Sequence, residues 1–221
     1  MLKILRNRTF GRLFAAQVVA LLGTGLLTVA LGLLAYDLAG SQAGAVLGTA
    51  LAIKMAAYVA VAPVISAFTD RVPRRVLLVG ADVVRAAVAV LLPLVDQTWQ
   101  VYVLIFALQA ASATFTPAFQ SLIPAVLVKE DDYTQGLSLS RLAYDLESLV
   151  SPVLAAALLT VVSYNFLFLG TVAGFVASAL LVISTVLPRT IPADRTQRLI
   201  DRITLGSRVW PRARSCAGCW P

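Results

Sequence analysis

The chain has 221 residues, of which 59% are hydrophobic and only 13% are charged, against about 25% charged residues in an ordinary soluble domain. A soluble protein of this length could not bury so much apolar surface, so the composition excludes a soluble fold and predicts a membrane protein. The net charge of +7 does not predict nucleic-acid binding, because lysine and arginine lie between apolar segments rather than along one face.

Six apolar segments follow one another along the chain, each close to the roughly 20 residues that a helix needs to cross a bilayer. Backbone groups inside a bilayer find no water, so each segment must pair them internally and is expected to be a helix. The predicted fold class is therefore an all-α membrane protein, a bundle of six transmembrane helices. The segments are Leu13–Tyr36, Ala43–Phe68, Val76–Leu94, Gln100–Ile123, Leu137–Leu159 and Tyr164–Leu187.

The positions of lysine and arginine predict the orientation. These residues precede the first segment, occupy the second and fourth connections and follow the sixth segment, whereas the other three connections contain none. The positive-inside rule then places both termini in the cytoplasm of a cell with the protein in its inner (plasma) membrane. We expect a cytoplasmic N-terminus (1–12), a six-helix transmembrane domain (13–187) and a basic cytoplasmic tail (188–221).

The connections are short, so successive helices are expected to be antiparallel neighbours. Glycines spaced four residues apart occur in the second segment, Gly44 and Gly48, and in the sixth, Gly170 and Gly174. They indicate either close helix contacts or simply the high frequency of glycine in membrane helices.

The connection between the second and third segments carries a charged motif. It reads Ser66-Ala67-Phe68-Thr69-Asp70-Arg71-Val72-Pro73-Arg74-Arg75. This resembles the signature of the major facilitator superfamily, G-x-x-x-D-R-x-G-R-R/K, with serine and proline in place of its two glycines. The resemblance implies a cytoplasmic gate whose charged contacts with the other half of the protein stabilise the outward-open state. The alternative is that the arginines only set the topology. The gate residues would be Asp70, Arg71, Arg74 and Arg75.

Two further segments resemble the drug and siderophore exporter branch of that family, which includes enterobactin exporters and macrolide efflux proteins. They are Ala81–Ala86 and Phe115–Pro124. The resemblance covers about residues 8–205 and implies one half of a major facilitator fold. Many proton-coupled exporters of this kind carry an arginine in the fourth helix. Gln109 is the nearest polar residue here and is taken as a cavity or coupling candidate, and without the arginine the resemblance does not imply proton coupling.

Charged residues inside apolar segments are costly and therefore indicate function. Lys54 lies near the middle of the second segment and is the basic residue that topology does not explain. It is a candidate for substrate contact or for pairing with an acid, although it could also line a solvated cavity or snorkel. Glu147 has no basic residue at helical spacing and is the candidate for a protonatable or cation-binding carboxylate.

Two other pairs of charges are expected to be structural ion pairs, because each has helical spacing. Asp82 and Arg85 are three residues apart, and Arg141 and Asp145 are four apart.

A polar stripe runs along the first segment. Gln17, Thr24 and Thr28 are spaced by seven and four residues. They either line a cavity or form interhelical hydrogen bonds, and Gln17 is taken as a cavity candidate.

The basic tail begins after Leu187-Pro188. Residues 189–206 resemble the start of the linker that joins the two halves in this family, but the sequence departs from the family from about Ser207, as a truncated or frameshifted gene would. Cys216 and Cys219 supply two ligands, which do not make a zinc site. We expect no metal and no cofactor.

The sequence therefore predicts a transporter that exports a small organic compound, a drug or a siderophore, by alternating access. H⁺ or another ion would drive it, and a second copy or a complementary half would complete it. The alternative is an inactive or regulatory half-transporter with only a structural role. A membrane enzyme is not expected, because the chain has no histidine and no convergent acids.

Overall fold

The computed structural model describes residues 2–69, 72–127 and 129–185, and the regular structure in these ranges is entirely helical. This confirms the predicted all-α class. Six helices have 18 residues or more. They are α2 (Arg8–Ala39), α3 (Ala43–Thr69), α4 (Arg74–Leu91), α5 (Thr98–Gln120), α7 (Glu130–Leu159) and α8 (Asn165–Ser184). Three short elements lie between them, η1 (Gly40–Gln42), η2 (Leu92–Leu94) and α6 (Ile123–Val126), and the short helix α1 (Leu2–Leu5) precedes α2.

Two helices begin earlier than hydropathy predicts. α2 begins at Arg8 because the Asn7 side chain accepts hydrogen bonds from the backbone amides of Thr9 (3.1 Å) and Phe10 (3.4 Å), which is the usual N-cap arrangement. α7 begins at Glu130, where three acidic residues occupy the first turn and interact favourably with the positive end of the helix dipole. Helical structure thus extends beyond the apolar segments into their polar flanks.

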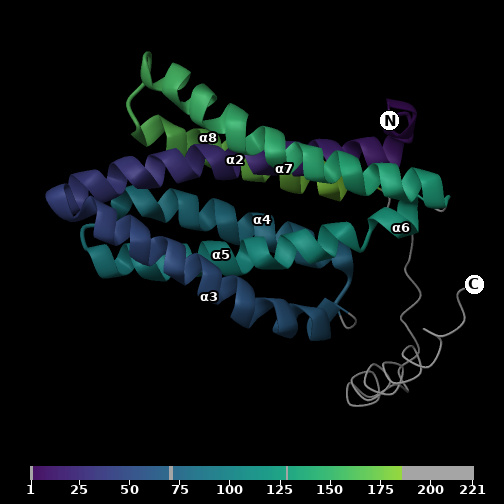
Figure 1. Ribbon diagram of the computed structural model, residues 1–221, viewed down its shortest axis with the longest axis horizontal. Coiled ribbons are helices and arrows are strands. Elements are labelled where there is room, and N and C mark those ends of the chain that lie inside the picture. Colours follow the sequence, from purple (N-terminus) through teal and green to yellow (C-terminus); the bar gives the residue numbers. More distant parts are fainter. Residues whose placement is uncertain (1, 70–71, 128, 186–221) are drawn as a thin grey trace, which may run out of the picture. The chain divides into compact units, whose positions relative to one another are not determined.

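Five segments of the described chain are long and apolar enough to cross a membrane. One of them, Arg8–Val61, has 54 residues and contains all of α2 and most of α3. The chain reverses direction between these helices, at Gly40, so α2 and α3 form a helical hairpin (Figure 1). Gly40 adopts a φ of 52°, a left-handed conformation that glycine reaches without steric cost.

Close backbone contact joins the first and last long helices. A Cβ atom added at Gly174 on α8 would lie 3.3 Å from the Cα atom of Gly23 on α2. The predicted close contact is therefore found at Gly174, whereas a Cβ atom added at Gly44 or Gly48 on α3 would meet no neighbouring atom of the described residues within 4 Å. Only small residues allow two membrane helices to approach so closely.

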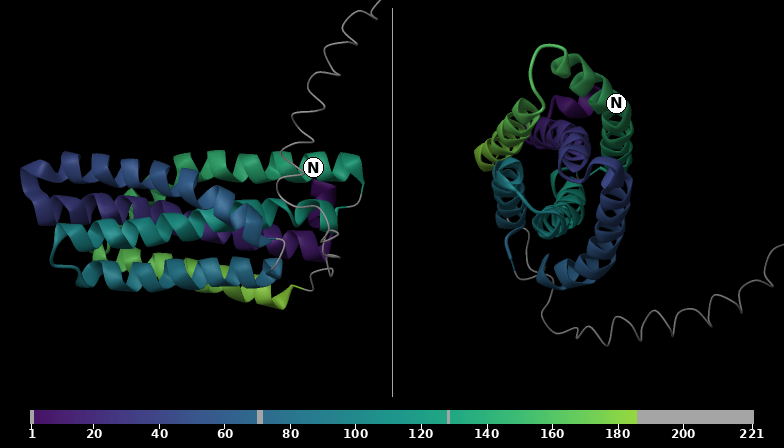
Figure 2. Two further views of the ribbon diagram at one scale, coloured as in Figure 1. Left: turned by 90° about the horizontal axis from the view of Figure 1, so that it is seen from below. Right: turned by 90° about the vertical axis from the view of Figure 1, so that its left-hand side faces the viewer.

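The remaining helix contacts place α3 and α7 at the edges of the bundle. α4 packs on α5 and α8, α3 packs mainly on α5, and α7 packs mainly on α2. The view along the helices in Figure 2 shows this ring of neighbours. Large apolar side chains on α3 and α7 stay exposed, including Met55 (63%), Val59 (76%), Leu149 (70%) and Val153 (69%). Such surfaces suit lipid or another membrane polypeptide.

Candidate functional site: a polar face and an acidic groove

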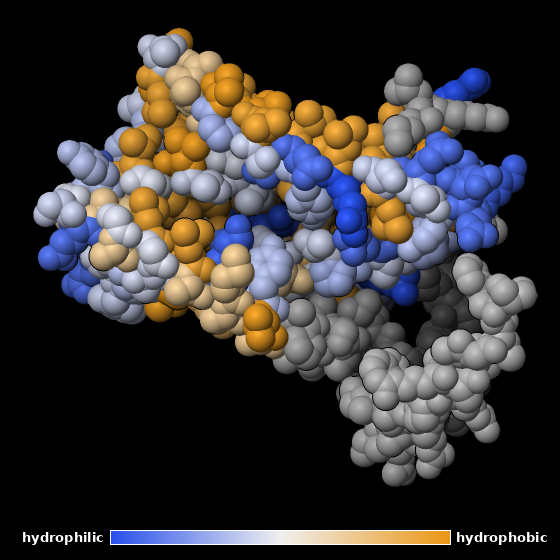
Figure 3. All heavy atoms as spheres, in the orientation of Figure 1, coloured by the Kyte–Doolittle hydropathy of each residue, from blue (hydrophilic) through white to orange (hydrophobic). Residues whose placement is uncertain are grey.

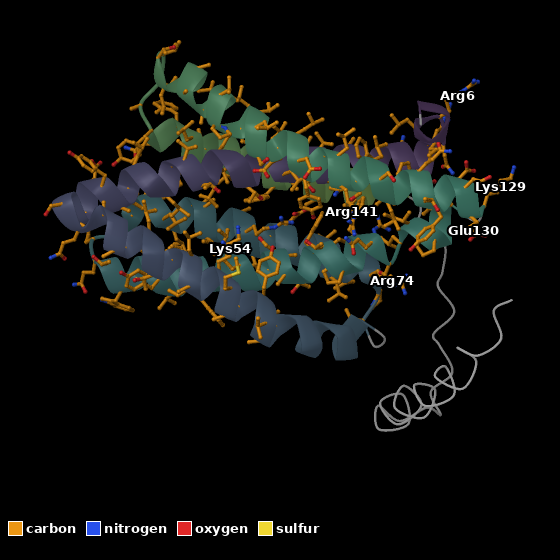
Figure 4. The ribbon with its side chains drawn as sticks, viewed as in Figure 1. Arg6, Lys54, Arg74, Lys129, Glu130 and Arg141 are labelled. Carbon is orange, nitrogen blue, oxygen red and sulfur yellow. The ribbon has the colours of Figure 1, made fainter. Side chains whose placement is uncertain are left out.

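Polar side chains gather on the face between α3 and α7. Figure 4 shows Lys54 of α3 and Arg141 of α7 on this side of the bundle, and Figure 3 shows hydrophilic surface across its middle, bordered by apolar side chains. Lys54 is half-buried and Arg141 is exposed. The Thr116 hydroxyl of α5 lies 3.2 Å from the Tyr144 hydroxyl of α7. We call Lys54, Thr116, Arg141 and Tyr144 the polar face.

A buried ion pair lies within the bundle, as the spacing of Asp82 and Arg85 predicts. Their side chains pair on α4, and both are nearly inaccessible to solvent. The second carboxylate oxygen of Asp82 accepts a hydrogen bond of 2.7 Å from the Ser178 hydroxyl on α8. Both oxygens of the Asp82 carboxylate therefore have the polar partners that burial of a charge requires.

Two aromatic rings complete the surroundings of Arg85. Its guanidinium carbon lies 4.4 Å from the ring centre of Phe115 on α5 and 4.7 Å from that of Phe175 on α8. A cation held over aromatic faces gains electrostatic stabilisation, most of all in a desolvated site. The pair with its rings thus joins α4, α5 and α8.

Glu147 lies in a different environment, at the contact between α2 and α7. It is half-buried and lines a cavity of about 400 Å³ whose other lining residues are apolar. A Cβ atom added at Gly25 of α2 would lie 2.7 Å from the Glu147 carboxylate and 2.0 Å from the Ser151 hydroxyl. Gly25 therefore provides the space that both polar side chains occupy.

No ion pair within the described part of the chain compensates this carboxylate directly. Among the described residues, the pair within 4 Å is that of Asp82 and Arg85. Lys54 acts on Glu147 electrostatically from α3 without forming such a pair. The buried Ser151 hydroxyl beside Glu147 has no hydrogen-bond partner in the described part of the chain. The two groups predicted as coupling candidates, Lys54 and Glu147, are thus within electrostatic range of each other.

The structure places Gln17 in the packing between helices rather than at a cavity. Its side chain is 1% exposed, and its amide nitrogen donates a 2.7 Å hydrogen bond to the Ser140 hydroxyl of α7. Thr24 and Thr28 donate to carbonyl groups of their own helix. Of the two alternatives for this stripe, interhelical bonding therefore holds for Gln17. Gln109 is half-buried on α5.

Arg141 and Asp145 do not form the predicted ion pair in the described structure, and both side chains are exposed on α7. Helical spacing brings two residues to one face of a helix. Holding two exposed side chains together costs conformational entropy, and the attraction between two solvated charges is too weak to offset that cost.

Half of the predicted gate can be located. Asp70 and Arg71 lie outside the described residues. Arg74 donates to the carbonyl oxygen of Ser121 just after α5, and Arg75 donates to that of Ile183 in the last turn of α8. Arg12 of α2 also donates to α8, at the Ser184 carbonyl (2.9 Å).

These three arginines thus satisfy free carbonyl groups at helix C-termini, where a positive charge also interacts favourably with the dipole. Sequence reasoning missed this capping role. The basic residues were recognisable, but their partners lie 47 to 172 residues away.

Comparison with known proteins gives the family. Residues 13–215 match the Major Facilitator Superfamily. Over 195 residues the chain is 28% identical to macrolide efflux protein A of Streptococcus pyogenes, which covers 86% of this chain and 47% of that protein. Macrolide efflux protein A of Enterococcus faecalis is 28% identical over 163 residues, 69% of this chain and 50% of that protein. The chain spans about half the length of these curated relatives, and no solved structure matches it. The family match extends past Ser207, and the chain belongs to the Major Facilitator Superfamily.

Proposed function

We propose that this chain is one half of an alternating-access transporter that exports a small organic compound. The observation that carries the proposal is the polar face, which lies between exposed apolar stretches of α3 and α7. In transporters of this type the substrate lies near the membrane midplane between two helical repeats. A second half, or a second copy of this chain, would cover the apolar stretches and enclose the polar face.

Six membrane crossings are part of this proposal. The hairpin at Gly40 supports counting α2 and α3 as two crossings rather than one, because each helix has more than the roughly 20 residues that a bilayer requires. An even number of crossings puts both termini on one side. The distribution of basic residues favours the cytoplasmic side of the plasma membrane.

The similarity to proteins named for macrolide efflux suggests a drug as the exported compound. A coupling ion, H⁺ or another cation, would act on Glu147, because it is the half-buried carboxylate without a direct ion pair in the described structure. The gate proposed for Asp70, Arg71, Arg74 and Arg75 would open and close the cytoplasmic end. The hydrogen bonds of Arg74 and Arg75 support this proposal, because they connect the start of α4 to the C-terminal ends of α5 and α8.

The test is drug accumulation in an efflux-deficient bacterial host. Cells would express the chain alone, or together with the second half of a macrolide efflux protein, and take up a radiolabelled macrolide. We expect lower accumulation than in vector controls, reversed by a protonophore. Lys54→Met on the polar face should restore accumulation, and Gly32→Ala on α2 should not. Equal macrolide accumulation in all cells, at matched membrane expression, would contradict the proposed function.

A further inference from the structure

The buried Arg85 uses only part of its hydrogen-bonding capacity within the ion pair. Its Nη2 donates to Asp82, and its Nε donates a long bond of 3.4 Å to the Ala81 carbonyl. A guanidinium carries five N–H donors, and Nη1 donates to none of the described residues. The Asp82 side chain is 0% exposed, whereas that of Arg85 keeps 4%. The guanidinium is therefore the member of the pair that has spare donors and reaches accessible space.

The surroundings of the guanidinium show where this space lies. Phe115 of α5 and Phe175 of α8 lie against it. Two phenols are within its electrostatic range, those of Tyr58 on α3 and Tyr144 on α7. These are the two helices that border the polar face, and both phenols are half-buried. The spare donors of Arg85 are thus placed behind the polar face, on the side of α3 and α7.

The charged side chains of the polar face itself are cationic. Lys54 lies four residues before Tyr58 on α3, about one helical turn away, and Arg141 lies on α7 across the face (Figure 4). Two carboxylates of α7 oppose them, but Asp145 is exposed and Glu147 lies at the contact with α2. Positive groups from α3, α4 and α7 therefore border one region of the bundle.

We infer that Arg85, Tyr58 and Lys54 form a subsite of the polar face that binds the carboxylate of an organic acid. A carboxylate accepts hydrogen bonds from Nη1 and from the Tyr58 hydroxyl, and such charge-assisted bonds are stronger than neutral ones. The ammonium group of Lys54 offsets the negative charge. The inference rests on the proposed function, which it deepens by naming acidic compounds as the exported class.

Two probes of one shape, with and without a charge, make the test specific. The full chain in phosphatidylcholine nanodiscs would be titrated with radiolabelled 1-naphthaleneacetate or with its neutral amide, 1-naphthaleneacetamide, and binding to empty nanodiscs would be subtracted. We expect saturable binding of the acid and at least about tenfold weaker binding of the amide, since a hydrogen bond to a charged group contributes more than a neutral one. Equal binding of the two probes would overturn the subsite.

Single variants locate the subsite. Tyr58→Phe removes one donor with little change of shape and should weaken acid binding about fivefold to tenfold. The matched control Tyr102→Phe removes another half-buried phenol, on α5, and should leave binding unchanged. Lys54→Met should weaken binding about threefold, because it removes a neighbouring positive charge. Acid binding that Tyr58→Phe and Lys54→Met leave unchanged would place the acid elsewhere.

Arg85 is tested together with its partner, because Arg85→Met alone would leave a buried carboxylate unpaired. The double variant Arg85→Met/Asp82→Asn removes both charges. It should bind the acid at least about tenfold more weakly than the wild type and bind the amide as the wild type does, which a misfolded protein would not do. A double variant with the wild-type affinity for the acid would overturn the role of Arg85. Tyr58→Phe, which retains the ion pair, tests the same subsite without this change in the core.

The subsite and the proposed function fail separately. Macrolide efflux from cells, together with no saturable acid binding by the purified chain, would contradict the subsite and leave the proposed function intact. Acid binding that shows the expected losses, together with no efflux of either macrolide or acid, would do the reverse.

Discussion

Two carboxylates inside the same helical bundle have opposite surroundings. Asp82 is fully buried, pairs with Arg85, accepts a hydrogen bond from Ser178 and lies beside two aromatic rings that hold its partner. Glu147 is half-buried at a groove, beside an unpartnered hydroxyl, with Lys54 acting only at longer range. A satisfied charge holds helices together, whereas an unsatisfied one is available to a ligand or a coupling ion.

The largest effect should follow from breaking the Asp82–Arg85 pair. Arg85→Met leaves the Asp82 carboxylate buried without its partner, which typically lowers the free energy of unfolding by about 3 to 5 kcal/mol. Denaturation of the purified protein in detergent, followed by circular dichroism, measures this.

The double variant Arg85→Met/Asp82→Asn is the control. It removes both charges and should recover most of the lost stability, since neutral replacements of a buried pair are often tolerated. An Arg85→Met protein as stable as the wild type would show that the pair does not hold α4, α5 and α8 together.

A smaller loss should follow from adding one methyl group between α2 and α7. In Gly25→Ala the new Cβ atom would meet the Ser151 side chain at about 2 Å, so the helices must separate, at a cost of about 1 to 3 kcal/mol. Gly32→Ala on the same helix meets no atom within 4 Å and should gain up to about 1 kcal/mol from helix propensity. Equal melting temperatures for the two variants would contradict the close contact at Gly25.

The hydrogen bond between α2 and α7 should contribute least. Ser140→Ala leaves the Gln17 amide without its 2.7 Å partner. Interhelical hydrogen bonds in membrane proteins contribute about 0.6 kcal/mol on average, so the melting temperature should fall by only a degree or two. A loss as large as that of Arg85→Met would mean that Gln17, rather than the ion pair, governs the packing of the bundle.

The contrast between the two carboxylates could be predicted in part. Hydropathy located the six long helices, because the requirement for internal backbone pairing leaves no other structure in lipid. Helical spacing identified both the Asp82–Arg85 pair and the lack of a local partner for Glu147. The same spacing argument did not hold for Arg141 and Asp145, because it says nothing about solvation.

Contacts between segments that are distant in the chain could not be predicted from the sequence. Ser178 is 96 residues from Asp82, and the carbonyl groups capped by Arg74 and Arg75 are 47 and 108 residues away in the chain. Whether Gln17 faced a cavity or another helix depended on how α2 and α7 pack. The groove at Glu147 likewise depends on the position of Gly25 opposite Ser151, which no local pattern indicates.

The most direct test of the contrast is the melting temperature of the full chain compared with those of Asp82→Asn and Glu147→Gln. We predict that Asp82→Asn melts far below the wild type, because it leaves the Arg85 charge buried without its partner, whereas Glu147→Gln melts within a degree or two of the wild type. A Glu147→Gln protein destabilised as strongly as Asp82→Asn, or an Asp82→Asn protein as stable as the wild type, would contradict the assignment of Asp82 to structure.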